Sequence, residues 1–162
     1  MSENSDKDIS IIITLYKTPT KNIKLLRQYE GYKVLIFDQA TNNDSKEKIG
    51  NLLKFNFEYY SSKKNLGLSK STNFLLSKVK TKYCLFTQPD ITINDQTIKK
   101  LKKIIKLKKN IIFAGPIIQT KKNYNHKPAK NIYKIKKKLD ASCLLCDVKK
   151  TSSSEAQGFA RD

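Results

Sequence analysis

Continuous apolar, β-branched runs recur along the chain and constrain its fold more than any other feature. The clearest two are "DISIIITLY" at 8–16 and "YKVLIFD" at 32–38. Uninterrupted runs of this kind are typical of strands buried on both faces, as in a parallel sheet. Further strands are predicted at 55–60, where apolar and polar residues alternate, and at 82–88 and 110–118.

Amphipathic helical patterns lie between these runs. The segment "LSKSTNFLLSKV" predicts a helix with one inward face formed by Leu68, Thr72, Leu75, Leu76 and Val79. The segment "NDQTIKKLKKIIKLKK" begins with Asn94 or Asp95 as a cap. Similar patterns follow the first two strands. This alternation predicts a three-layer α/β/α sandwich with a mostly parallel sheet and right-handed crossovers. The lysines of the last helix are interpreted as a solvated surface, with binding to an anionic membrane as the alternative.

One domain is expected over residues 8–150, and the ends of the chain differ from it. Within it, residues 119–138 are polar and basic and predict a loop, and "LDASCLLCDV" predicts a further strand. The final segment "TSSSEAQGFARD" has no Lys, Ile or Asn, although the rest of the chain is rich in them. Residues 1–7 and 151–162 are therefore expected to be disordered or non-native tails.

The net charge of +19 raises the question of a nucleic-acid partner. Only Arg27 and Arg161 are arginines, so nearly all of the positive charge is lysine. Base readout and bidentate phosphate contacts favour arginine, so we do not expect nucleic acid to be the partner. The polar N-terminus does not resemble a signal peptide, and no apolar run approaches the roughly 18 residues of a membrane span. We expect a cytoplasmic protein, with peripheral contact to the inner face of a membrane as an option.

Three cysteines offer little evidence for a metal or redox centre. Cys143 and Cys146 form a C-x-x-C, but they lie inside a predicted strand, and His126 is the only histidine. No second cysteine pair is present to complete a zinc site. Cys84, Cys143 and Cys146 are therefore expected to be small buried thiols in a reducing compartment.

Polar residues follow the predicted strands where each of them ends. Thr14 and Tyr16 close the first strand, Asp38 closes the second, Asp90 follows the fourth, and Gly67 lies in the turn after the third. In an open α/β sheet, ligands bind outside the carboxyl ends of the strands. Two acids at strand ends, together with a strand-to-helix turn that contains a glycine, therefore predict a ligand site, and the helix start after that turn favours a phosphate group.

Four motifs in order resemble the landmarks of family 2 glycosyltransferases with the GT-A nucleotide-sugar fold. They are "IIITLYKTP", "VLIFDQATNNDS", "NLGLSKSTN" and "LFTQPD". The "QPD" form is most similar to the rhamnosyltransferase-like branch. The resemblance covers residues 8–150 and implies a C-terminally truncated enzyme, because "LDASCLLCDVKK" resembles the strand that begins the acceptor half of that family.

The resemblance implies that Asp90 binds Mg²⁺ or Mn²⁺, the cation that bridges the diphosphate of the sugar nucleotide. Pro89 would fix the turn that carries this acid out of the sheet. Gln88 departs from the family pattern, because many relatives have an acid there. An amide adds no negative charge, so weaker metal binding is expected.

The resemblance also implies a nucleotide-sugar site. Asp38 would bond the base or ribose, Thr14 and Tyr16 would line the nucleoside pocket, and Asn65, Gly67 and Asn73 would form its floor. For Asn73, an ordinary polar position on a helix is the alternative interpretation. The general base that an inverting transfer needs is not identifiable, since no motif selects Asp140, Asp147 or Asp162.

The sequence is therefore interpreted as a domain that binds a nucleotide diphosphate sugar for transfer to a hydroxyl of a glycan or lipid-linked acceptor in polysaccharide synthesis. A truncated module that holds nucleotide without transferring sugar is the alternative. A basic α/β domain that binds nucleic acid is the third reading.

Overall fold

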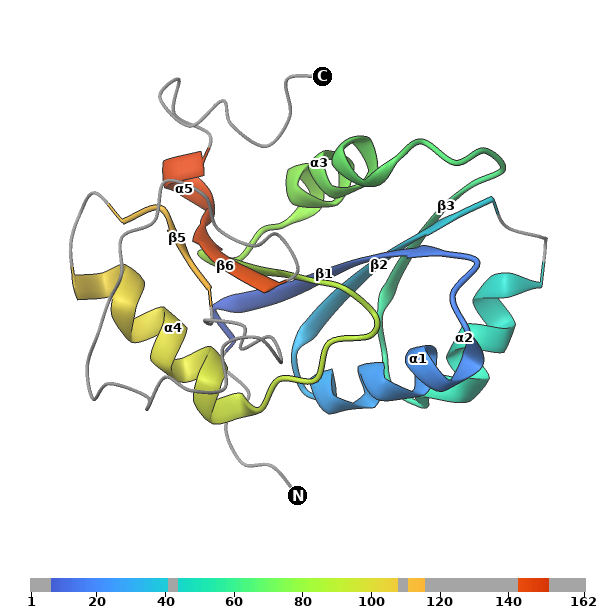
Figure 1. Cartoon of the computed structure of the whole chain (residues 1–162), viewed down its shortest axis with the longest axis horizontal. Helices are drawn as coiled ribbons and strands as arrows, with labels where there is room; N and C mark the ends of the chain where they lie inside the picture. The colour runs from blue at the N-terminus through green and yellow to red at the C-terminus, as the bar shows by residue number, and fades with distance from the viewer. Residues whose placement is uncertain (1–6, 41–43, 108–110, 116–142, 152–162) are drawn as a thin grey trace, which may run out of the picture.

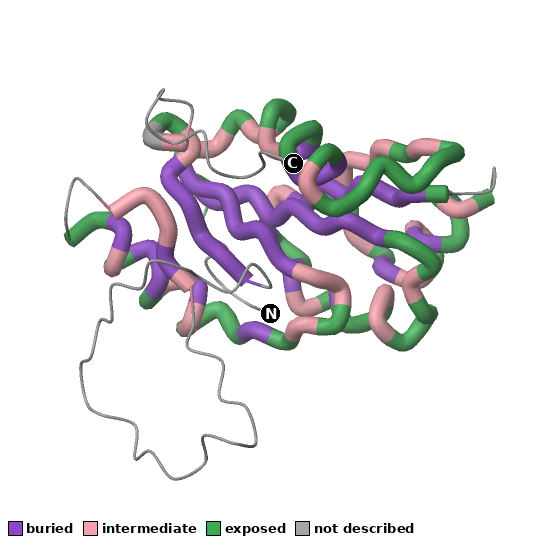
Figure 2. Tube along the Cα trace, turned by 45° about the horizontal axis from the view of Figure 1, so that its top comes forward, coloured by how far each residue is buried: buried purple, intermediate pink, exposed green. Residues whose placement is uncertain are grey.

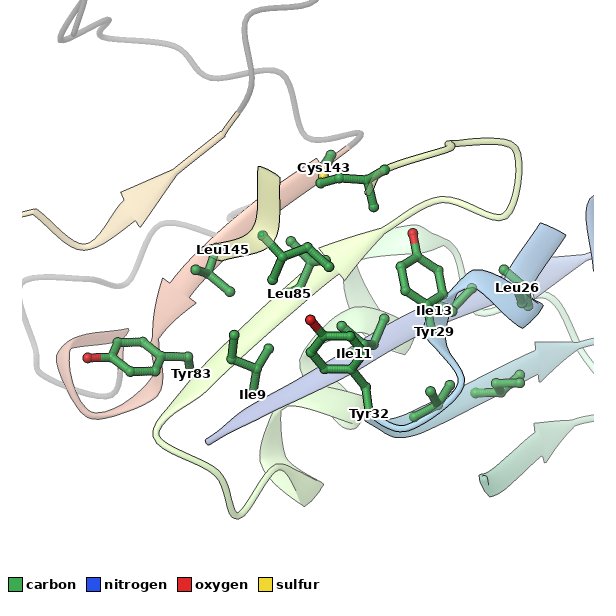
Figure 3. Close-up of a cluster of buried hydrophobic side chains, with 14 of the residues drawn as sticks. Ile9, Ile11, Ile13, Leu26, Tyr29, Tyr32, Tyr83, Leu85, Cys143 and Leu145 are labelled. Carbon is green, nitrogen blue, oxygen red and sulfur yellow. The ribbon is translucent and has the colours of Figure 1, made fainter. Parts of the chain in front are cut away.

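A six-stranded mixed sheet with helices on both faces forms the described part of the chain. The computed structural model describes residues 7–40, 44–107, 111–115 and 143–151. The strands are β1 (Ile9–Tyr16), β2 (Lys33–Gln39), β3 (Glu58–Ser62), β4 (Tyr83–Thr87), β5 (Phe113–Ala114) and β6 (Cys143–Asp147). The helices are α1 (Thr20–Leu25), the 3₁₀ helix η1 (Leu26–Tyr29), α2 (Ser45–Leu53), α3 (Leu68–Lys78), α4 (Asp95–Leu107) and α5 (Val148–Thr151). This is the predicted α/β/α architecture with a mostly parallel sheet.

The strand order is β3-β2-β1-β4-β6-β5. Strands β1, β2, β3 and β4 pair in parallel, with Leu15 opposite Asp38 and Ile13 opposite Thr87. Their carboxyl ends consequently meet at one edge of the sheet, as the sequence predicts. Strand β1 lies inside the sheet and is buried over its length except at Tyr16, because its Ile-rich sequence presents apolar side chains to both layers.

The two faces of the sheet carry separate cores. Alternate residues of β1, such as Ile11 and Ile13, pack with Leu26 and Tyr29 of η1, and helices α2 and α4 complete that layer. On the other face, Ile12 and its neighbours pack against α3 and the region of α5. A large apolar side chain that is fully buried contributes about 1.5–3 kcal/mol, so the two cores dominate the stability of the domain.

One strand runs against the parallel strands of the sheet, and another is shorter than predicted. The strand predicted at 110–118 is much shorter in its described part, since β5 has two residues. Strand β5 pairs antiparallel with β6, which is itself antiparallel to β4, so β5 runs in the same direction as β1–β4. Strand β6 lies between β4 and β5 and is antiparallel to both. Gly115 fits beside β6 because glycine has no Cβ. A Cβ there would lie 2.8 Å from Leu144 Cδ2 and 2.9 Å from the Cys143 carbonyl oxygen, too close for either contact.

The buried faces of α3 and α4 also differ in detail from the predicted ones. Leu68 is 45% exposed at the start of α3, where Ser71 is buried instead, whereas Thr72 and Leu75 are buried as predicted. On α4, Lys102 is buried although lysines of this helix were predicted to be solvated. Its Nζ lies 3.5 Å from Asp8 Oδ2 and 5.2 Å from the centre of the Tyr83 ring, so both contacts offset the cost of burying its charge.

No helix among the described residues is both long enough and apolar enough to cross a membrane. Three predictions lie outside the described residues in whole or in part. They are the loop at 119–138, the first residues of the strand predicted at 139–148, and the two tails apart from Lys7 and Thr151. Thr151 ends α5.

Candidate functional site

A cavity of about 270 Å³ opens at the carboxyl ends of β1 and β2. It lies on the face of the sheet that α1 and α2 cover. Its lining residues come from these two strands, the turns that follow them and the two helices: Leu15, Lys17, Thr18, Thr20, Ile23, Asp38, Gln39, Ala40, Ser45, Lys48, Ile49 and Leu52. The cavity thus combines an apolar wall with hydroxyl groups, two lysines and one carboxylate, as small-molecule sites do.

Asp38 is the acid of this cavity and is only 8% exposed. It lies on the same face of β2 as Val34 and Ile36, because side chains alternate along a strand. The Tyr59 hydroxyl donates a hydrogen bond of 3.1 Å to its Oδ2. Burial raises the pKa of Asp38, and the bond from Tyr59 opposes this rise.

The chain leaves β1 and β2 in a strained conformation beside the cavity. Lys17 follows the last residue of β1 with a φ of 48°, and Ala40 follows the last residue of β2 with a φ of 56°. A left-handed conformation of a residue other than glycine costs on the order of 1–3 kcal/mol and is concentrated at functional sites. Both residues line the cavity, so the strain coincides with the candidate site.

A second polar cluster lies on the opposite face of the sheet, beneath the start of α3. The Ser71 hydroxyl lies 3.3 Å from Thr14 Oγ1 and 2.8 Å from the carbonyl oxygen of Gly67, to which it donates. Asn65 Oδ1 accepts the Gly67 amide at 2.9 Å, and Gln39 Oε1 accepts the Leu66 amide at 2.7 Å. Gly67 has a φ of 81°, a value that favours glycine, so this turn needs the glycine that the motif contains.

The structure thus separates some of the predicted site residues. Thr14 and Asp38 end neighbouring strands, but Thr14 contacts α3 and Asp38 contacts the cavity on the other face. Tyr16 is 45% exposed at the end of β1, and Asn73 is exposed on α3. Of the predicted nucleotide-site residues, only Asp38 lines the cavity.

Asp90 lies in a tight turn directly after β4. The Ile91 amide donates to the Gln88 carbonyl oxygen at 3.2 Å, which places Pro89 at the second turn position and Asp90 at the third. Proline suits the second position because its fixed φ matches the turn. The Asp90 side chain is exposed, whereas Gln88 and Pro89 are half-buried.

The residues at this turn fit a divalent cation only in part. Within the described ranges, no three His, Cys, Asp or Glu side chains gather at one point. Magnesium and manganese are commonly held by one or two carboxylates together with phosphate oxygens of a substrate. The single carboxylate of Asp90 therefore suits a cation shared with a diphosphate, and does not suit a site made by protein alone.

Sequence reasoning missed the residue that holds this turn in place. Gln28 of η1 donates from Nε2 to the Ile91 carbonyl oxygen at 2.8 Å and accepts the Ile93 amide on Oε1 at 2.9 Å. Further along, the Tyr32 hydroxyl bonds Asp95 Oδ1 at the start of α4. No local pattern identifies Gln28, because its partners lie more than sixty residues away in the sequence.

The sheet topology, with the acid turn and the cavity at its carboxyl edge, defines an α/β protein of the GT-A class. The model of the family described as "Glycosyl transferase family 2" matches residues 10–156. The chain belongs to this family. No curated protein matches the chain.

A solved structure with a TM-score above 0.5 supports the same fold. A mannosyltransferase from Pyrobaculum calidifontis, solved in complex with GDP-Man and Mn²⁺, is similar with a TM-score of 0.64 at 12% identity, over 86% of this chain and 44% of that one. TarS from S. aureus is similar with a TM-score of 0.48 at 18% identity, over 61% of this chain and 19% of that one. A further TarS structure, residues 1–349 with UDP-GlcNAc, has a TM-score of 0.49 at 19% identity, over 61% of this chain and 31% of that one. The chain thus spans less than half of each of these structures.

Proposed function

We propose that the domain binds a nucleotide diphosphate sugar and presents it for transfer to an acceptor hydroxyl. The observation that carries the proposal is the cavity at the ends of β1 and β2, where one buried acid and two strained strand exits meet. Membership of glycosyl transferase family 2 supports glycosyl transfer in general. Residues 8–150 are proposed as the domain that performs this binding.

The nucleoside is proposed to occupy the cavity. An ionised Asp38 has one carboxylate oxygen bonded to Tyr59, and its other oxygen can accept an N–H of a base or a hydroxyl of ribose. Lys17 and Lys48 bring positive charge to the cavity wall, which favours an anionic ligand. Tyr16, Thr14, Asn65, Gly67 and Asn73 are proposed to surround the rest of the donor, with an ordinary polar position as the alternative for Asn73.

The diphosphate is proposed to lie near Asp90, since β4 is adjacent to β1 and the acid turn leaves the same edge of the sheet. Asp90 would hold Mg²⁺ or Mn²⁺ together with the phosphate oxygens, and Gln88 would add a neutral oxygen. When bound, such a cation supplies charge neutralisation for the departing nucleotide diphosphate. The Mn²⁺ in the Pyrobaculum calidifontis complex supports this assignment.

The finer assignment follows the motifs. We propose a donor of the kind used by the rhamnosyltransferase-like branch and a glycan or lipid-linked acceptor. We also propose a role in polysaccharide synthesis at the cytoplasmic side of a membrane. Exposed lysines on α4, including Lys100, Lys103 and Lys106, would support peripheral contact with anionic lipid. The alternative is a module that holds nucleotide without transferring sugar.

Calorimetry with UDP, dTDP and GDP, each with and without Mn²⁺, tests the proposal. We expect binding of at least one nucleotide and tighter binding when Mn²⁺ is present. An Asp38→Ala variant should lose nucleotide binding, whereas Glu47→Ala is a matched control because Glu47 is an exposed acid on α2 that does not line the cavity. Negligible heat in all titrations would overturn the proposal, and salt-sensitive retention on DNA would then favour the nucleic-acid reading.

Release of nucleotide diphosphate separates the transferase from the binding module. The assay supplies a panel of sugar nucleotides with sugar and lipid-linked acceptors. Release that rises with one acceptor and disappears in Asp90→Asn would support the transferase. Nucleotide binding without any acceptor-dependent release would favour the module.

A further inference from the structure

We propose that Gln28 is a positioning residue, which holds the Asp90 turn against the helical wall of the nucleotide cavity and so couples cation binding to nucleotide binding. This inference rests on the proposed function. It concerns a residue that touches neither the nucleotide nor the cation in that proposal.

The contact is a two-point attachment. The Gln28 side-chain amide donates to the Ile91 carbonyl oxygen at 2.8 Å and accepts the Ile93 amide at 2.9 Å. Both bonds are partly buried, which shields them from competing water. A planar amide that bonds two backbone groups of one segment restricts that segment more than a single bond does, because it fixes both its position and its rotation.

The attached segment begins at the acid itself. Ile91 follows Asp90 directly, and its amide also closes the turn onto the Gln88 carbonyl oxygen. The peptide unit between Asp90 and Ile91 is thereby fixed by the turn, and the next unit by Gln28. Ile93, which is buried, anchors the far end of the segment in the core. The exposed carboxylate of Asp90 therefore stands on a backbone held from both sides.

The other end of the attachment reaches the cavity. Gln28 lies in η1, which continues directly from α1, and α1 contributes Thr20 and Ile23 to the cavity wall. One helical unit thus contacts the proposed nucleoside pocket and holds the proposed cation turn. A ligand that contacts both benefits when their relative position is fixed in advance, because less ordering remains to be done on binding.

The expected effect is a loss of coupling rather than a loss of nucleotide binding. Gln28→Met keeps the length of the side chain but removes both hydrogen bonds. We expect the factor by which Mn²⁺ tightens UDP binding to fall about tenfold, a typical size for coupling between two sites. Affinity for UDP without Mn²⁺ should stay within about twofold, since the cavity itself is intact. Gln28→Glu keeps the acceptor for the Ile93 amide and loses the donor, so its effect should be intermediate.

The experiment is calorimetry of UDP with and without Mn²⁺ on the full chain and its variants, joined to hydrogen exchange at the Ile93 amide. Gln96→Met is the matched control, because Gln96 is an exposed glutamine on the first turn of α4. Faster exchange at Ile93 in Gln28→Met, with a reduced Mn²⁺ effect, supports the inference. Faster exchange with an unchanged Mn²⁺ effect overturns it and leaves the proposed function standing. If the unmodified chain binds dTDP or GDP instead of UDP, that nucleotide replaces UDP in these titrations, and no binding of any of the three overturns both.

Discussion

The Tyr59 hydroxyl donates a hydrogen bond of 3.1 Å to Oδ2 of Asp38, and so joins the edge strand β3 to the carboxyl end of β2. Asp38 is nearly buried, and its charged form is disfavoured by the loss of water around it. The tyrosine bond therefore does two things, since it orients the carboxylate and favours its ionised state.

Removal of this bond should change the pH dependence of nucleotide binding. The pKa of Asp38 is raised by burial and lowered by Tyr59, so Tyr59→Phe should raise this pKa further. If the ionised carboxylate accepts a hydrogen bond from the ligand, UDP affinity is lost as pH falls through the pKa of Asp38. The acid limb of a plot of affinity against pH should therefore move to higher pH in the variant. Tyr60→Phe is the matched control, because Tyr60 bonds Glu58 instead; equal shifts in both variants would argue against the role of Tyr59.

The Asp90→Asn variant should lose the Mn²⁺-dependent part of nucleotide binding and keep its fold. Asp90 is exposed, and substitutions at exposed positions usually change stability by less than about 0.5 kcal/mol. Calorimetry and thermal unfolding measured on the same sample check both halves of the prediction. A large drop in melting temperature would instead indicate that Asp90 supports the turn.

Tyr29 should make the domain sensitive to alkali. Burial raises its pKa to about 12 from an ordinary value of 10.0, and its hydroxyl lies 3.3 Å from Thr87 Oγ1. The folded state keeps this proton at a pH where the unfolded state has lost it. Stability is consequently unaffected below pH 10 and falls as pH rises towards 12, by about 3 kcal/mol at most.

Urea unfolding at several pH values between 9 and 12 measures this contribution. Tyr29→Phe should show a shallower fall in the free energy of unfolding than the unmodified chain over that range. Lysine titration is common to both proteins, so the difference between them isolates Tyr29. Parallel curves would contradict the assignment.

Two of the three thiols should resist modification in the native state. Burial raises the pKa of Cys143 to about 11 and raises the pKa of Cys84 well above its ordinary value. Thiolates are the reactive form, so a disulfide reagent at pH 8 should modify these residues only at the rate of unfolding. A Cys146→Ser variant leaves these two thiols alone for measurement. Rapid modification of both without urea would show that the core around β4 and β6 is open.

The elements that the sequence predicted well are those specified by local pattern. Strands β1 and β2 begin and end within a residue or two of the apolar runs, because such runs are stable only where both faces are covered. The Asn94 cap is confirmed, since its Oδ1 accepts the Thr97 amide at 2.8 Å. The gathering of strand ends at one edge followed from the parallel order of these strands.

Features that depend on residues distant in the sequence could not be predicted from local sequence patterns. The pairing of β6 between β4 and β5 depends on partners that are distant in the sequence, and a short apolar run does not encode its neighbours. Gln28 and Tyr59 look like ordinary surface residues of a helix and an alternating strand until their partners are known. The roles of Thr14, Tyr16, Asn65, Gly67, Asn73 and Asp90 in donor binding stay predictions.

The position of β6 has a consequence for how the chain assembles as it is made. Strand β4 pairs with β1 on one side, but its other edge is completed only by residues 143–147, and Thr87 pairs with Cys143. Until those residues emerge from the ribosome, β4 presents an open edge of unpaired backbone groups, and its buried Leu85 lacks the neighbouring Leu145. Open edges of this kind template pairing with other chains. The nascent protein is therefore vulnerable to aggregation between the synthesis of β4 and that of β6, when four parallel strands can already have formed and the strand that pairs with β4 has not been made.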